Sequence, residues 1–244
     1  MKRLMLIIFS STNMLHAEQA PDWLMPADQD YIHRIEALDS FHSVEDVIQE
    51  PEVLQFSSRL ELKNAARKAH KNRRWSEALE LSRAVLNQEP GNKEMRLILA
   101  TALSNTRKYS ESLVEFDLLV NQDHDNRDAW YQRAHVLEKL KRFEDALNSY
   151  DKALEANSNS SWIYYDKAAL LRRLKRVDEA IKALDESIRL RPNHVWANLE
   201  MGNLLFNRKD YANASRYFEK VVELKPDAPD AQQRLKICQD KLAN

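Results

Sequence analysis

Residues 127–160 read RDAWYQRAHVLEKLKRFEDALNSYDKALEANSNS. Two apolar stripes with helical spacing lie in this stretch, one over residues 130–140 and the other over residues 143–156. The polar pair Lys141 and Arg142 separates them. The stretch therefore predicts two amphipathic helices joined by a short turn.

The same pattern returns at constant spacing in five consecutive units of equal length, which we place at 59–92, 93–126, 127–160, 161–194 and 195–228. Two helix axes approach closely only where side chains are short, so a small column predicts where the paired helices touch. A large apolar column predicts the filling between neighbouring hairpins. Three columns keep the spacing without slippage: Ala66, Ala100, Ala134, Ala168 and Gly202; Ala78, Ser112, Ala146, Ala180 and Ala214; and Trp75, Tyr109, Phe143, Val177 and Tyr211.

At these columns the chain resembles the tetratricopeptide repeat family. The resemblance implies an all-α fold, a right-handed superhelical array (α-solenoid) of five helix-turn-helix repeats with a C-terminal capping helix. Arg133 and Lys167 depart from the pattern, because the family usually has leucine there, and Ser82 replaces a large residue. The residues that carry the resemblance are Trp130, Ala134, Phe143, Ala146, Tyr150 and Ala153 in the third unit, and Gly202, Tyr211, Ala214, Phe218 and Pro226 in the fifth.

Three further segments flank the repeats. Residues 1–17 (MKRLMLIIFSSTNMLHA) have the basic start and short apolar run of a secretory signal peptide. Residues 18–58 are expected to form a partly helical cap, with a mobile arm as the alternative. Residues 229–244 are expected to form a capping helix whose Leu235, Cys238 and Leu242 face the last repeat. The leader predicts a periplasmic or secreted protein after cleavage near Ala17; the alternative is anchoring at the inner membrane by an uncleaved N-terminus.

Composition excludes several classes of protein. Only Gly91 and Gly202 occur in 244 residues, and the net charge is −1, so neither a glycine-rich phosphate-binding loop nor the basic footprint of a nucleic-acid binder is expected. The single Cys238 allows no intramolecular disulfide and no thiolate metal site. We therefore predict a protein that is not an enzyme and has no cofactor and no metal ion.

The low glycine count also leads to an expectation about the turns. We interpret them as built from polar residues and proline, so that few positions need a positive φ angle. Gly91 then marks the end of a helix, and Gly202 provides small size at a helix contact. The prolines expected to end second helices are Pro90, Pro192 and Pro226.

The resemblance also implies a concave face lined by the first helix of each repeat. Trp162 and Trp196 occupy equivalent places there, and two interpretations stay open: groove residues, or packing against the second helix of the preceding unit. The basic run 68–74 is interpreted as a solvated helix end. The candidate peptide-binding residues are Tyr131, His135, Trp162, Tyr165, Arg172, Trp196, Leu199, Asn203 and Phe206.

These features predict a non-enzymatic scaffold or adaptor that holds a peptide or helix of another protein, in the assembly of an envelope complex. The alternative is a regulatory or positioning subunit of a membrane-associated enzyme machine, for polysaccharide synthesis or cytochrome maturation. No nucleic-acid partner and no small-molecule substrate are expected. A weak homo-oligomer and the redox state of Cys238 stay open.

Overall fold

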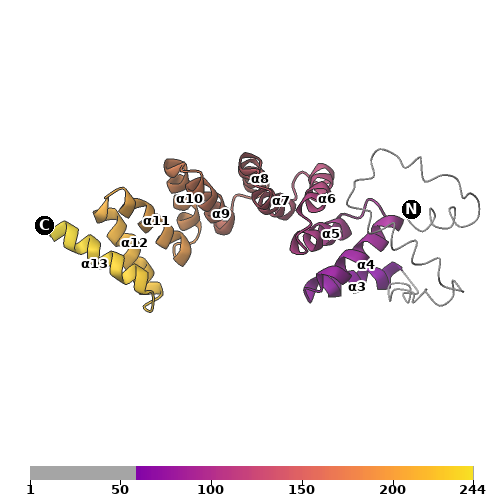
Figure 1. Cartoon of the computed structure of the whole chain (residues 1–244), viewed down its shortest axis with the longest axis horizontal. Helices are drawn as coiled ribbons and strands as arrows, with labels where there is room; N and C mark the ends of the chain where they lie inside the picture. The colour runs from indigo at the N-terminus through magenta and orange to yellow at the C-terminus, as the bar shows by residue number, and fades with distance from the viewer. Residues whose placement is uncertain (1–58, 244) are drawn as a thin grey trace, which may run out of the picture. The chain divides into compact units, whose positions relative to one another are not determined.

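The computed structural model describes residues 59–243, and the predicted leader (1–17) and cap or arm (18–58) lie outside these residues. The described part forms eleven helices and no strand (Figure 1). The helices follow one another in antiparallel pairs, which confirms the predicted all-α array of helix-turn-helix repeats. They are α3 (Arg59–Lys71), α4 (Trp75–Gln88), α5 (Lys93–Asn105), α6 (Tyr109–Gln122), α7 (Arg127–Lys139), α8 (Phe143–Ala156), α9 (Ser161–Arg173), α10 (Val177–Leu190), α11 (Val195–Asn207), α12 (Tyr211–Leu224) and α13 (Pro229–Ala243).

The first helix of each later repeat begins at a side-chain cap. The backbone N–H of Ala129 donates to Asn126 Oδ1 over 3.0 Å, and the residues one repeat before and after make the same bond. This cap satisfies an N–H group that has no partner inside the helix. The capping residues of α5, α7, α9 and α11 are Asn92, Asn126, Ser160 and His194.

The turn inside every repeat contains a residue with positive φ, contrary to the expectation drawn from the glycine count. In the third repeat Lys141 has φ 61°, and the N–H of Arg142 donates to the Leu137 carbonyl over 2.9 Å. This is a Schellman turn, whose left-handed position is usually filled by glycine. Neither glycine of the chain has a positive φ. The five left-handed residues are Arg73, Arg107, Lys141, Lys175 and Lys209.

The small column lies where the two helices of a repeat touch. Ala134 is completely buried, as are its equivalents in the first, second and fourth repeats. A Cβ atom added to Gly202 would lie 2.8 Å from Cε1 of Phe218. The predicted role of Gly202, small size at a close helix contact, is therefore correct.

The departures from the family pattern have polar partners of their own. Arg133 Nε donates to Asp117 over 2.7 Å, and the guanidinium also reaches the Ser149 hydroxyl at 2.6 Å. One repeat later, Lys167 pairs with Asp151. Each cation thus bridges to the second helix of the preceding repeat, where an apolar residue would otherwise pack.

Helix α13 follows the last repeat and has only one apolar face, whereas the first helix of a repeat packs on two faces. Ala231 and Cys238 are buried, and Leu235 packs beside them. Gly202 and Leu205 pack inside the fifth hairpin. The equivalent positions of α13, one period later, carry the polar residues Lys236 and Gln239, so α13 lacks this second apolar face. The expectation for Leu242 is wrong: its side chain is exposed, because it lies beyond the end of the last repeat.

Cys238 is a buried free thiol. Burial raises its pKa, so it stays protonated and packs as a small apolar side chain. Within residues 59–243, no helix combines the length and the apolar character needed to cross a membrane.

The left-handed turns yield a first prediction. A non-glycine residue in this conformation costs roughly 1–2 kcal/mol, whereas glycine adds about 0.5–1 kcal/mol of unfolded-state entropy. Lys141→Gly should therefore raise the free energy of unfolding by about 0.5–1 kcal/mol in urea titrations. Lys141→Val should lower it, because a β-branched residue fits this conformation poorly. Equal stability of the two variants would contradict the assigned turn.

Gly202 yields a second prediction. Gly202→Ala should lower the free energy of unfolding, because a Cβ against the Phe218 ring costs about 1–3 kcal/mol, more than the helix propensity gained. The preceding repeat pairs Ala168 with Leu184 at the same two places. The same glycine-to-alanine change made in a Phe218→Leu background should therefore be neutral or stabilising. Destabilisation of the same size in both backgrounds would show that the ring is not the cause.

Candidate functional site

All nine predicted site residues lie on the first helices of the last three repeats. Tyr131 and His135 belong to α7; Trp162, Tyr165 and Arg172 belong to α9. Trp196, Leu199, Asn203 and Phe206 belong to α11. Tyr131, Tyr165 and Leu199 stand one repeat period apart, so the fold gives them equivalent places on neighbouring helices.

A polar cluster joins α7 to α9. The Tyr131 hydroxyl donates to Asp166 Oδ2 over 2.5 Å, and His135 Nε2 lies 3.6 Å from the same oxygen. The Tyr131 and His135 rings meet edge to face at 4.6 Å. These contacts hold two predicted site residues against one carboxylate of the next repeat.

A second carboxylate lies beside this cluster. The Tyr150 hydroxyl, from α8, donates to Glu138 Oε1 over 2.6 Å and lies 3.3 Å from His135 Nδ1. Arg173 lies 3.5 Å from the other Glu138 oxygen. Burial, followed by the nearby carboxylates, raises the pKa of Tyr131 and Tyr150 far above that of free tyrosine. Both hydroxyls therefore remain neutral hydrogen-bond donors.

Trp162 lies in an aromatic group formed with the start of the next repeat. Its ring meets His194 edge to face at 4.2 Å, and Tyr165 lies 6.1 Å away. The Arg191 guanidinium lies 6.0 Å from the indole centre. Trp162 is nevertheless 46 % exposed and Trp196 53 % exposed. About half of each indole thus remains open, which favours the groove interpretation over packing against the preceding repeat.

An ion pair continues the surface from α9 to α11. Arg172 pairs with Glu200, whose carboxylate is mostly buried. Burial, and then the charges of Glu200 and Asp166, raise the pKa of Tyr165. Arg172 therefore serves first as a link between helices, with its side chain half exposed.

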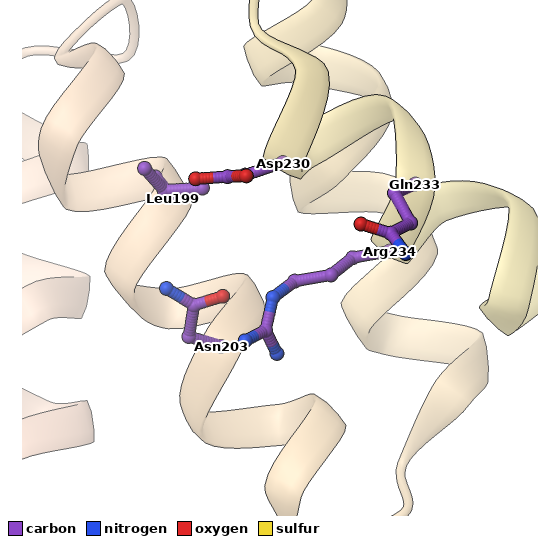
Figure 2. Close-up of a pocket in the computed structure, with 5 residues that line it drawn as sticks. All are labelled: Leu199, Asn203, Asp230, Gln233 and Arg234. Carbon is purple, nitrogen blue, oxygen red and sulfur yellow. The ribbon is translucent and has the colours of Figure 1, made fainter.

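A hollow of about 270 Å³ lies between α11 and α13 (Figure 2). Leu199 and Asn203 line it from α11, and Asp230, Gln233 and Arg234 line it from α13. Asn203 Oδ1 is buried there and accepts no hydrogen bond from the described residues. The Arg234 guanidinium lies 5.2 Å from the Phe206 ring centre.

The α13 residues of this hollow were not predicted, although the 34-residue spacing would have indicated them. Asp230 and Gln233 follow Trp196 and Leu199 by one full repeat period. The capping helix therefore extends the same columns as the repeats. Asp166, Glu200 and His194 were also missed, since their partners become adjacent only when the repeats stack. Across residues 59–243, no three His, Cys, Asp or Glu side chains gather closely enough to hold a metal ion.

Comparison with known families settles the class of the fold. Four models described as tetratricopeptide repeat match residues 69–135, 128–160, 149–182 and 197–228, which together make up more than half of the chain. The chain belongs to the tetratricopeptide repeat family. No curated protein matches the sequence.

Several solved structures are similar to this chain in fold. MamA from Desulfovibrio magneticus RS-1 is 20% identical over 71% of this chain and 98% of its own, with a TM-score of 0.64. YrrB, titled a TPR protein with an unusual peptide-binding site, is 20% identical over 73% and 92%, at 0.62. PilF from Pseudomonas aeruginosa is 17% identical over 75% and 85%, at 0.64. At these identities the likeness establishes the fold alone.

The buried cap His194 yields a third prediction. Burial, and then the charge of Arg191, lower its pKa below the usual 6.5. As the pH falls below 6.5, His194 therefore takes up a proton more readily in the unfolded chain than in the folded chain, and the free energy of unfolding decreases. We expect the difference in melting temperature between pH 7.5 and pH 5.5 to be smaller in His194→Asn than in the wild type. Asparagine preserves the cap, as Asn92 and Asn126 do. An unchanged pH dependence would exclude His194 as its source.

Proposed function

We propose that this protein is a non-enzymatic scaffold that binds a peptide or helix of a partner protein along α7, α9, α11 and α13. The observation that carries the proposal is the pair of half-exposed indoles, Trp162 and Trp196, one repeat apart. Large exposed aromatic side chains are typical anchors of protein interfaces. Most other large apolar side chains in the described part are buried or partly buried.

The polar groups beside the indoles suit the backbone of such a peptide. Asn203 Oδ1 is buried without a donor, so a peptide N–H would supply the hydrogen bond it lacks. Arg234 forms no ion pair within residues 59–243 and lines the same hollow. Together with Asp230 and Gln233, it offers donors and acceptors for a peptide group (Figure 2).

We further propose that the protein acts in the periplasm or outside the cell, in the assembly of an envelope complex. The support is the leader at residues 1–17, with its basic Lys2 and Arg3 before an apolar run. Fractionation of cells that express the full chain tests this. A processed protein released with the periplasm is expected, and an unprocessed cytoplasmic protein would contradict it.

Peptide selection tests the groove itself. We expect a displayed library of random dodecapeptides, selected on the wild-type protein, to yield ligands that bind the Trp162→Ala/Trp196→Ala variant at least tenfold more weakly. A matched control is Val114→Ala/Leu118→Ala, which removes two exposed apolar side chains from α6. The control should bind as the wild type does, and all three proteins should keep the wild-type helical content.

Two results would overturn the groove assignment. One is a set of selected peptides that bind the double tryptophan variant as tightly as the wild type. The other is a loss of binding in the α6 control that equals the loss in the tryptophan variant, because the ligand would then not sit on the first helices.

A further inference from the structure

Each turn inside a repeat presents one cation that no residue of the described chain neutralises. Arg73, Arg107, Lys141, Lys175 and Lys209 are all exposed, and none forms an ion pair within residues 59–243. The next residue is also basic in four turns, but it is paired: Arg74 with Glu77, Lys108 with Glu111, Arg142 with Asp145 and Arg176 with Glu179. The unpaired charge is thus always the left-handed residue.

The backbone conformation makes this choice of residue unusual. The left-handed position of a Schellman turn favours glycine, and a side chain there strains the backbone. All five repeats carry lysine or arginine at this place instead. The backbone hydrogen bonds of the turn hold this conformation but need no charged side chain, and no ion pair within the described residues uses the five charges. The cations therefore point to a role in binding something outside the chain.

The fold gathers these cations on one edge. Helices alternate in direction along the chain, and the first helices of consecutive repeats contact one another. All turns inside repeats therefore lie on one edge, and all connectors between repeats lie on the opposite edge. The five turns (72–74, 106–108, 140–142, 174–176 and 208–210) hold ten Lys or Arg residues and one acidic residue. The connectors (89–92, 123–126, 157–160, 191–194 and 225–228) hold two basic and four acidic residues.

The overall charge of −1 conceals this separation. In the sequence alone, the basic run 68–74 predicts only a solvated helix end. The stacking of the repeats aligns its turn with the four other basic turns. We call the five turns, with their left-handed cations, the basic edge.

We propose that the basic edge is an electrostatic contact surface for the anionic headgroups of a lipid bilayer. Successive cations stand one hairpin apart, and none of them lines the hollow between α11 and α13, so they do not surround a ligand of fixed shape. Lipids diffuse within the bilayer and can meet charges at any spacing. Each basic residue near an anionic bilayer strengthens binding by about fivefold, and the factors multiply because the free energies add.

The aromatic residues beside the turns argue against nucleic acid as the occupant. Trp75, Tyr109, Phe143 and Tyr211 begin the second helices, but all four pack against the hydrophobic core. Their rings are therefore not free to stack on bases, as single-stranded nucleic acid requires.

Attachment through this edge leaves the proposed peptide surface accessible. Trp162 and Trp196 stand at the second positions of α9 and α11, at the ends of these helices away from the basic edge. The protein can therefore bind a bilayer at one edge and a peptide near the opposite edge at the same time. This inference is independent of the proposed function.

Vesicle co-sedimentation of the full-length chain tests the proposal. The probes are vesicles of phosphatidylcholine alone and vesicles of seven parts phosphatidylcholine to three parts phosphatidylglycerol, at low and high salt. We expect the wild type to bind only the anionic vesicles and to lose binding at high salt. The variant Arg73→Gly/Arg107→Gly/Lys141→Gly/Lys175→Gly/Lys209→Gly should bind at least tenfold more weakly. Its fold is not at risk, because glycine relieves the strained conformation.

A matched control removes five exposed cations elsewhere, by changing Lys152, Lys182, Arg216, Lys225 and Lys236 to glutamine. The control has the same net charge as the turn variant and should stay within a few-fold of wild-type binding. Equal losses in the two variants would show that only net charge matters and would overturn the basic edge as a surface.

Two further arms decide the occupant. Polyglutamate or single-stranded DNA that binds the wild type more tightly than the anionic vesicles do, at equal charge concentration, would overturn a lipid surface. The turn variant should still bind the peptides selected on the wild type. A negative vesicle assay would therefore contradict the lipid proposal without affecting the peptide-groove proposal. A negative peptide selection would contradict the groove proposal without affecting the basic edge.

Discussion

The structure depends on one close contact, where the two helices of each hairpin meet across a column of small residues. Ala134 has no exposed surface, and at Gly202 even one methyl group would strike the Phe218 ring. Short side chains here let large ones such as Tyr150 and Phe218 be fully buried beside them. Since a hairpin buries little surface alone, each must stack on its neighbours, and the strict repeat period is the consequence.

The turns show how a local strain can coexist with a regular fold. Five lysine or arginine residues adopt a conformation that suits glycine, and the Schellman hydrogen bonds around them hold the turn in place. The dense helix contact on either side fixes the ends of the turn, so a small backbone cost is tolerated in every repeat. The scarcity of glycine therefore does not mean that left-handed residues are scarce.

The exposed faces of the first helices are joined by polar rather than apolar contacts. Tyr131 of α7 donates to Asp166 of α9, and Arg172 of α9 pairs with Glu200 of α11. Such contacts bind neighbouring helices while leaving a surface that water and peptide groups can share. The two indoles stand out because they are the large aromatic side chains on this face that remain half open.

The sequence by itself determined the helix pairs, their period, the capping helix and the face that carries the nine candidate residues, because side-chain size and helical spacing are local properties. Only the tertiary structure decided which side chains become partners. Asp166 and Glu200 gain theirs from the neighbouring repeat. Leu242 is exposed because it lies beyond the end of the last repeat, and Arg234 and Asn203 line one hollow only because α13 packs beside α11. The positive φ of Lys141 could likewise not be predicted from the sequence, since the geometry of a turn is set by the two helices that it joins.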